Sequence, residues 1–328
     1  MRIAIGPFDP NDPGSDWPVY QSETLEPDFE IAPFGVGEPV PDAGVLVVWS
    51  PEYAGHVGRS FSGYKVAVVG DWHIVPFEQM PWLKEYDLIC ADRRGVERLV
   101  VLGYPRARLL YFRQFSFDPR LHFSPISAAN EPPPRDIVAA FMGRNVPVRR
   151  PLLETLRVWG QRTGRRVHIE THYPRGHEAD VYGRAKIALN MSQRGELNMR
   201  AYESAACGAL GVLQHGAIPE LLAANAPVPT YDPNRLEAFL ESWLAAPDLL
   251  AEWVGRQQEW VQRERPVDHL GWLCRQIAAR MPKGGRNVVP SSRISTRDAG
   301  PGSGEPSPND QRPECVALAI GPRDPLRR

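Results

Sequence analysis

The sequence predicts an α/β protein built from two doubly wound domains, and three observations support this fold class. Short apolar runs recur along the chain, and several are continuous rather than alternating, which is typical of strands buried on both faces of a parallel sheet. Segments with helical spacing lie between many of these runs. A stretch with three consecutive prolines, 124–134, divides the runs into two series and predicts a linker.

The first series predicts an N-terminal domain over residues 1–123. Its strands are expected where the sequence reads RIAIG, GVLVVWS, KVAVVGDW, YDLICAD and ARLLYF, at 2–6, 44–50, 65–72, 86–92 and 107–112. A helix is expected over 93–103, with Gly103 as its C-cap. The segment 7–41 is rich in Pro, Gly and Asp, so it is predicted to be rich in loops.

The second series predicts a C-terminal domain over residues 135–281. Strands are expected at 136–143, 165–171, 185–192 and 209–214. Helices are expected at 149–164, 198–208 and 217–224, and the pattern from 235 to 281 is helical throughout. The remaining residues, 282–328, are rich in Pro, Gly and Ser with few apolar side chains, which predicts a disordered tail.

Composition narrows the possible functions. The net charge of -1 argues against a general nucleic-acid-binding surface. Only four of the 38 basic residues are lysines, so a phosphate site here is expected to use arginine. The four cysteines form no C-x-x-C pair, which indicates reduced thiols in a cytoplasmic protein. The apolar runs are strand-sized, so no transmembrane segment is expected.

The stretch NMRAYESAACG, 198–208, carries the strongest functional signal. With Asn198 as N-cap, it predicts a helix that runs to Cys207 and ends at Gly208. Glu196, Arg200 and Glu203 then fall close to one face near the helix N-terminus. An arginine beside a helix N-terminus suits a diphosphate, and a carboxylate one turn further in suits the vicinal hydroxyls of a ribose. The alternative is a surface ion pair between Arg200 and Glu203.

The residues Asn198, Arg200, Tyr202, Glu203 and 206–208 resemble the donor-binding signature of glycosyltransferases with the GT-B fold. The resemblance is closest to the family-1-like C-terminal domains of CgeB-like spore-maturation proteins. GAIPEL, 216–221, resembles a motif of the related family-4 enzymes, and AFMGR, 140–144, resembles the strand that opens the donor domain. In all, the resemblance covers about residues 135–280.

This resemblance implies a GT-B fold of two Rossmann-like domains facing a cleft, with a reduced N-terminal acceptor domain. It implies a bacterial, hexosyltransferase-like enzyme that moves a sugar from a nucleotide-diphosphate sugar to an acceptor, which could be a glycan, a protein or a small molecule. Glu203 would bind the ribose, and the full set of expected donor-binding residues is Gly143, Arg144, Arg149, Glu196, Asn198, Arg200 and Glu203. Glu196 departs from the family-4 spacing, because six residues rather than seven separate it from Glu203.

Two other functions remain open on the same fold: a non-catalytic nucleotide-sugar-binding module and a nucleotide-sugar epimerase. The Asp-x-Asp motif of metal-dependent sugar transferases is absent from the sequence. We therefore expect no metal or other cofactor, with Arg144 and Arg149 stabilising the leaving diphosphate instead.

Two further groups of residues are candidates for chemistry. GDWH, 70–73, follows an apolar strand, so His73 is a candidate general base and Asp71 a residue that orients it or acts itself. The alternative is a loop histidine bonded to backbone. VHIETH places His168, Glu170 and His172 on one face of a strand, with His177 and Glu178 nearby, which is a possible metal cluster or the polar face of an edge strand.

Overall fold

The structure is a computed structural model of the chain. It describes residues 1–8, 25, 27–54, 57–112, 117, 122, 134–171, 173–174, 176–192, 198–214, 226–263 and 266–282. The expected linker, except for Pro134, and the expected tail beyond residue 282 lie outside these ranges. Among the described helices, none combines the length and the apolar content that crossing a membrane requires.

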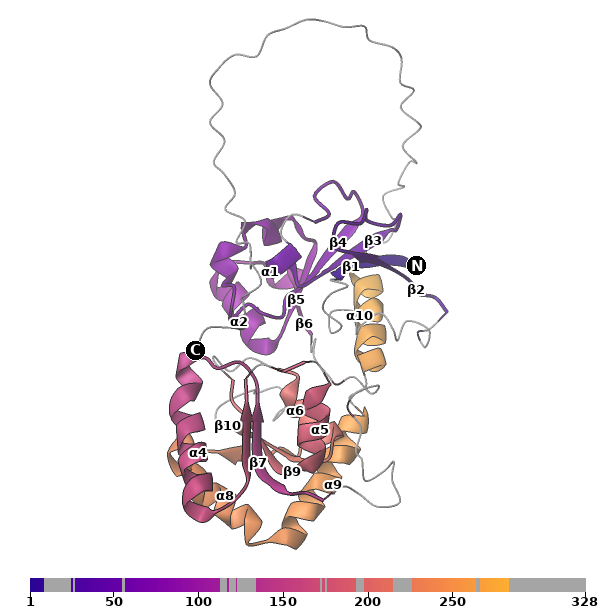
Figure 1. Cartoon of the computed structure of the whole chain (residues 1–328). Coiled ribbons are helices and arrows are strands. Elements are labelled where there is room, and N and C mark those ends of the chain that lie inside the picture. Colours follow the sequence, from indigo (N-terminus) through magenta and orange to yellow (C-terminus); the bar gives the residue numbers. More distant parts are fainter. Residues whose placement is uncertain are drawn as a thin grey trace, which may run out of the picture. The chain divides into compact units, whose positions relative to one another are not determined.

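The N-terminal part forms a six-stranded parallel sheet in the order β2-β1-β3-β4-β5-β6 (Figure 1). Its strands are β1 (Arg2–Phe8), β2 (Glu30–Gly35), β3 (Val45–Trp49), β4 (Tyr64–Val68), β5 (Leu88–Ala91) and β6 (Leu109–Tyr111). All five expected strands are present. Every residue of β3 and β5 is buried, as their continuous apolar runs predict.

Strand β2 was not predicted, because the segment 7–41 was expected to be loop-rich. It pairs with β1 in register, with Ile3 opposite Ile31. Pro33 lies within β2 and cannot donate a ladder hydrogen bond, which is tolerated because β2 is an edge strand. A short edge strand that contains proline carries little of the pattern by which a strand is recognised.

Two short helices follow strands of this sheet. The first, α1 (Pro51–Ala54), comes directly after β3. The second, α2 (Arg93–Val101), begins after Asp92, whose Oδ1 accepts the N–H of Gly95 at 2.6 Å. Gly103 has a φ of 85° and follows the helix end, as expected of a glycine that stops a helix.

A helix from the far end of the chain also covers this sheet. In α10 (Pro266–Arg280), four buried residues share a core with β1, β3, β4 and β5: Leu270, Leu273, Cys274 and Ile277. The ring of Trp272 stacks on Phe112 with centroids 6.1 Å apart. The helical pattern of 235–281 is therefore confirmed, although its last helix packs on the first sheet.

The C-terminal part forms a five-stranded parallel sheet in the order β11-β10-β9-β7-β8 (Figure 1). The strands are β7 (Ile137–Met142), β8 (Val167–Glu170), β9 (Ala185–Asn190), β10 (Leu210–Gln214) and β11 (Thr230–Tyr231). The helices are α4 (Arg150–Thr163), α5 (His177–Arg184), α6 (Arg200–Ala206), α8 (Leu236–Leu244) and α9 (Pro247–Arg263). The sequence did not predict α5 or the two-residue β11, and the helix expected at 217–224 lies outside the described residues.

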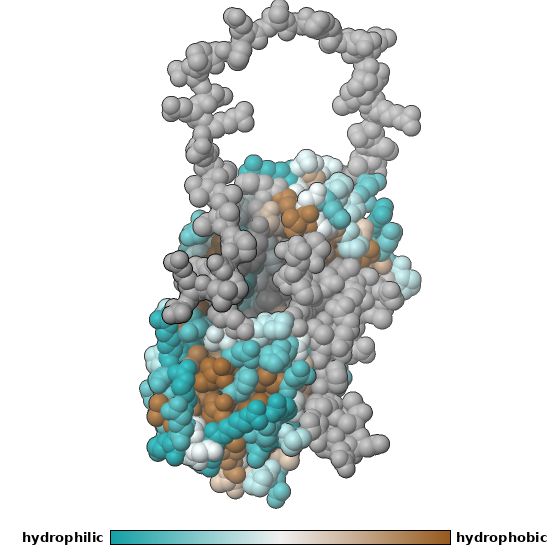
Figure 2. Space-filling view, in the orientation of Figure 1, coloured by the Kyte–Doolittle hydropathy of each residue, from teal (hydrophilic) through white to brown (hydrophobic). Residues whose placement is uncertain are grey.

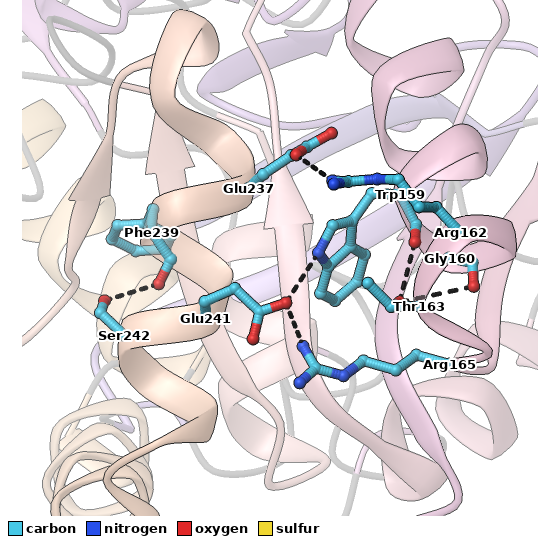
Figure 3. A network of polar contacts seen from close by, with 9 residues as sticks. All are labelled: Trp159, Gly160, Arg162, Thr163, Arg165, Glu237, Phe239, Glu241 and Ser242. Atoms are coloured by element: carbon cyan, nitrogen blue, oxygen red, sulfur yellow. Dashed lines mark hydrogen bonds and ion pairs between the residues drawn. The ribbon is translucent and has the colours of Figure 1, made fainter.

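Helices α4 and α8 are held together by aromatic and ionic contacts (Figure 3). The indole Nε1 of Trp159 donates to Oε1 of Glu241 at 3.0 Å, and Arg165 binds the same oxygen at 2.5 Å. The guanidinium of Arg165 also lies 5.2 Å from the centre of the Trp159 ring. Arg162 forms an ion pair with Glu237, which lies one helical turn before Glu241 in α8. These contacts fix the helices on the side of the sheet that Leu152, Leu156 and Leu240 fill.

Helix α6 differs in detail from its prediction. It begins at Arg200 with Met199 as N-cap, and no side chain caps it. Asn198 is therefore not the N-cap, and the prediction for this residue was wrong. The short α6 is almost completely buried, and Tyr202 stacks on Trp260 of α9 with ring centroids 5.2 Å apart.

Figure 2 shows brown, apolar residues gathered within a mostly teal surface in the lower half of the view, where Figure 1 shows the second sheet.

Candidate functional site

The topology of the second sheet defines where a ligand is expected. The chain runs from β7 to its neighbour β8 and then crosses to the other neighbour, β9. The carboxyl ends of β7 and β9 therefore form a topological switch point, where open parallel sheets bind ligands. Gly143 follows β7 and Met191 follows β9, so the predicted donor residues around Gly143 lie at this point.

Gly143 and Arg200 are in direct contact at the end of β7. The Nη1 of Arg200 donates to the carbonyl oxygen of Met142 at 3.2 Å. Gly143 has a φ of 151°, and a Cβ on it would lie 2.2 Å from Nη1 of Arg200. Only glycine fits this backbone conformation and this close approach. The missing side chain of Gly143 thus leaves the space in which the guanidinium of Arg200 lies.

Arg149 spans the switch point. Its side chain is 2% exposed, and its Nε and Nη2 donate to the carbonyl oxygen of Met191 at 3.1 and 2.8 Å. Its Nη1 donates to the carbonyl oxygen of Arg144 at 3.0 Å. Arg144 itself is exposed, and its backbone carbonyl is what contacts Arg149. Arg149 is therefore held rigidly by backbone acceptors from both strand ends.

The buried guanidinium of Arg149 and the half-buried guanidinium of Arg200 share one aromatic ring. The Cζ of Arg149 lies 5.7 Å from the centre of the Phe141 ring, and the Cζ of Arg200 lies 5.8 Å from it. A ring face within about 6 Å attracts a cation and partly replaces its lost hydration. The arrangement concentrates positive charge at the carboxyl edge of β7.

Several buried polar atoms of Arg200 and of residues near the ends of β9 and α6 have no hydrogen-bond partner among the described residues. They are Nδ2 and Oδ1 of Asn190, Nδ2 and Oδ1 of Asn198, and Nε of Arg200. Asn190 is the last residue of β9, so it also lies at the switch point. Buried polar groups in folded proteins are nearly always paired, so a cluster of unpaired ones is the pattern expected where a polar ligand binds.

Glu203 lies in a buried cluster with a histidine and a second glutamate. Glu203 is 8% exposed, Glu178 of α5 is 4% exposed, and His122 is 1% exposed. The Nε2 of His122 lies 3.1 Å from Oε1 of Glu178 and 3.9 Å from Oε1 of Glu203. A surface ion pair, the alternative for Glu203, is excluded by this burial.

Neither His122 nor Glu178 was predicted to be part of this site. Burial opposes ionisation of Glu178, but hydrogen bonds from His122 and from the backbone N–H of Gly176 outweigh it, so the pKa of Glu178 is lowered. Burial, with the nearby charge of Glu203, raises the pKa of Tyr173 to about 12. The ionised carboxylate of Glu178, in α5, therefore places negative charge on the α5 side of the site, which balances the positive charge of the two arginines.

Two expected elements of the donor site cannot be placed. Glu196 and the segment GAIPEL, 216–221, lie outside the described residues. The expected contribution of Glu196 to sugar binding stays a prediction.

The candidate catalytic residues Asp71 and His73 follow β4, at the carboxyl edge of the first sheet. A third residue, Glu52 of α1, holds this loop: its Oε1 accepts the N–H of Gly70 at 3.0 Å and that of Asp71 at 2.7 Å. Burial raises the pKa of Glu52 to about 7, although these hydrogen bonds oppose the rise. The sequence signal that was available for Glu52 is its position directly after the apolar run 44–50.

Comparison with known proteins agrees with this architecture. Residues 140–270 match the family model described as glycosyl transferase-like. No curated protein matches the sequence.

Solved structures resemble most of the chain. The sucrose-phosphate synthase of Thermosynechococcus elongatus is 11% identical, with a TM-score of 0.55 over 85% of this chain and 99% of that one. The Anabaena protein HepE, solved in complex with UDP-glucose, is 12% identical, with a TM-score of 0.56 over 85% of this chain and 99% of that one. The UDP-forming trehalose-phosphate synthase of Burkholderia vietnamiensis is 11% identical, with a TM-score of 0.51 over 71% of this chain and 72% of that one.

At these identities the structural likeness establishes the fold alone. The chain has the GT-B fold, and its residues 140–270 are similar to the glycosyl transferase-like family.

Proposed function

We propose that the protein is a glycosyltransferase that binds a nucleotide-diphosphate sugar at the carboxyl edge of the second sheet. The observation that carries this proposal is the pair of guanidinium groups at the switch point, Arg149 buried and Arg200 half-buried, both on the ring of Phe141. A family match over the same residues and neighbours solved with a nucleotide sugar support it. The acceptor would be a glycan, a protein or a small molecule, and the proposed location is the cytoplasm.

In this proposal Arg200 contacts the diphosphate directly. Its Nε has no partner among the described residues, and its Nη1 is anchored to the carbonyl of Met142. Arg149 donates hydrogen bonds to backbone carbonyls through Nε, Nη1 and Nη2, so we propose that it acts mainly through its charge. Asn190 and Asn198 offer further polar atoms to the ligand.

The chemistry requires the acceptor oxygen to attack the anomeric carbon while the bond from that carbon to the diphosphate breaks. The negative charge that develops on the leaving diphosphate is stabilised by preorganised donors that need not reorient. We propose that the arginines supply this stabilisation without a bridging metal ion. His73 or Asp71 would receive the proton of the acceptor hydroxyl.

Glu203 is proposed to accept hydrogen bonds from the ribose hydroxyls. Hydrogen bonds to a charged group contribute about 1.5–3 kcal/mol, so Glu203→Gln should weaken the binding of a nucleoside diphosphate about 10- to 100-fold. The measurement is isothermal titration of UDP and GDP, followed by assays of donor hydrolysis and transfer.

Glu178→Gln is the matched control, because Glu178 shares His122 with Glu203 but is not assigned to the ribose. Its affinity for nucleotide should change much less. Equal losses in both variants would show that the cluster around His122, and not a ribose contact, controls binding. Unchanged affinity in a folded Glu203→Gln protein would refute the ribose assignment.

Turnover distinguishes the remaining possibilities. Nucleotide binding without transfer or hydrolysis would indicate a binding module, and interconversion of the donor would indicate an epimerase. Activity should persist in EDTA, and a loss that Mg²⁺ or Mn²⁺ restores would contradict the proposed absence of a bridging metal.

A further inference from the structure

Two histidines and a glutamate converge at the outer edge of the second sheet. The Nε2 of His168 lies 2.9 Å from Oε2 of Glu170, and the Nε2 of His177 lies 3.1 Å from the same oxygen. The three side chains are 29%, 38% and 30% exposed for His168, His177 and Glu170. Of the three residues that the sequence analysis grouped, His172 lies outside the described residues, and His177 completes the cluster in the structure.

The fold explains this convergence. In the edge strand β8, Val167 and Ile169 pack into the core beneath α4. Because side chains alternate along a strand, His168 and Glu170 point to the opposite face. His177 is the first residue of α5, and α5 packs on β7 and β9 through Val181 and Tyr182. Strand β8 and helix α5 thus bring the side chains of His168, Glu170 and His177 together.

We propose that His168, Glu170 and His177 bind a divalent transition-metal ion, with zinc as the best fit. Two imidazole nitrogens and one carboxylate oxygen are ligands that Zn²⁺ prefers and that Mg²⁺ does not select. Zinc–ligand bonds of about 2.0–2.1 Å place two ligand atoms of a tetrahedral site about 3.3 Å apart. The observed separations are close to this value, so an ion needs only small movements of the side chains.

The exposure of the three side chains also suits a metal ion. The partial exposure of all three side chains leaves access for the ion and for a water molecule as fourth ligand.

The ion would join the end of β8 to the start of α5. The carbonyl oxygen of Glu170 accepts the N–H of Gly143 at 3.0 Å, so this strand end also borders the donor site. The ligands of the ion are the side chains of His168, Glu170 and His177, whereas the proposed diphosphate contact is Arg200. A zinc ion here has a structural effect and does not replace the arginines.

The test uses the full chain, purified without a polyhistidine tag and freed of metal with a chelator. Titration with ZnCl2 should show one saturable site per chain, and saturating Zn²⁺ should raise the Tm by at least about 2 °C. Mg²⁺ should give neither effect. Tetrahedral Co²⁺ bound in place of zinc should absorb strongly in the visible range.

His168→Ala and His177→Ala should each weaken Zn²⁺ binding at least about tenfold, since even outer partners of a metal ligand typically contribute about 10–100-fold. His73→Ala is the control, because it removes a partly exposed histidine that follows a strand of the other sheet. Failure of the wild-type chain to bind Zn²⁺ would overturn the proposal. Binding that is unchanged in the double variant, or weakened as much by His73→Ala, would also overturn it.

Discussion

Substituting Gly143 with alanine should abolish most nucleotide binding without removing any charged or polar side chain. The new Cβ would lie 2.2 Å from Nη1 and 3.0 Å from Cζ of Arg200. Carbon and nitrogen cannot approach this closely, so the guanidinium must leave its place beside the carbonyl of Met142. The proposed diphosphate contact is then lost although Arg200 itself is still present.

The structure also sets the magnitudes. A residue with a side chain at a φ of 151° is strained, and such strain costs about 1–3 kcal/mol of stability. Losing a charge-assisted contact to the diphosphate costs a further 1.5–3 kcal/mol of binding free energy, or about 10- to 100-fold in Kd. Stability would be measured by urea unfolding and affinity by titration with UDP or GDP.

Gly164 provides the matched control. It ends α4 with a φ of 67°, and a Cβ on it would meet nothing within 4 Å. Gly164→Ala should therefore cost about 1–2 kcal/mol of stability and leave nucleotide affinity unchanged. If Gly143→Ala binds nucleotide as tightly as the wild type, or if both variants lose affinity equally, the contact between Gly143 and Arg200 does not position the diphosphate ligand.

Two further predictions concern charge. Arg200→Ala should lower kcat by about 100- to 1,000-fold, as for the loss of one preorganised donor, and Arg200→Lys should restore little, because lysine lacks the guanidinium geometry; rescue by lysine would contradict this role. The raised pKa of Glu52, about 7 against 4.5 in the unfolded chain, predicts stability that is present below pH 4.5 and lost as the pH rises through 7. At about 1.36 kcal/mol per pKa unit the loss is about 3 kcal/mol. Urea unfolding at pH 5 and pH 8 should show this loss in the wild type but not in Glu52→Gln, and equal pH dependence in both proteins would contradict it.

The elements that the sequence predicted share one property: each is dominated by its own local pattern. The local sequence alone predicts the continuous apolar strands β3 and β5. It also predicts the glycines at which α2 and α4 end. The elements that it missed lack such a pattern. Helix α5 begins with the residues 177–180, His-Glu-Ala-Asp, and mixes charged with buried residues. Strand β2 has a proline in its centre.

The candidate site divides in the same way. Arg200 and Glu203 could be found because they are three residues apart in one short motif. His122 and Glu178 are 56 residues apart, and nothing in the sequence indicates that they meet. Asn198 was misassigned for a related reason. Its type is common at helix N-caps, but α6 starts one residue later, and the amide atoms of the side chain are buried without capping the helix.

The topology of the first sheet adds a constraint on the acceptor side of the reaction. The chain runs from β1 to β2 and then crosses to β3 on the other side of β1, so the switch point of this sheet lies between β1 and β3. The residues that follow β3 are Ser50, with a φ of 55°, and then α1 with Glu52. His73 follows β4, one strand away from that point.

Glu52 connects these two positions. Its carboxylate binds the backbone of Gly70 and Asp71, so it holds the loop that carries the candidate catalytic residues against the loop at the switch point. A buried carboxyl whose pKa is raised to about 7 is neutral or ionised within the physiological range, and its proton decides how strongly it binds those two N–H groups. Because burial disfavours the ionised carboxylate more than the two N–H groups stabilise it, the buried arrangement that holds the loop with His73 becomes less stable as the pH rises through 7. Glu52 is therefore a positioning residue for His73 and Asp71, because its carboxylate binds the backbone of the loop that carries them.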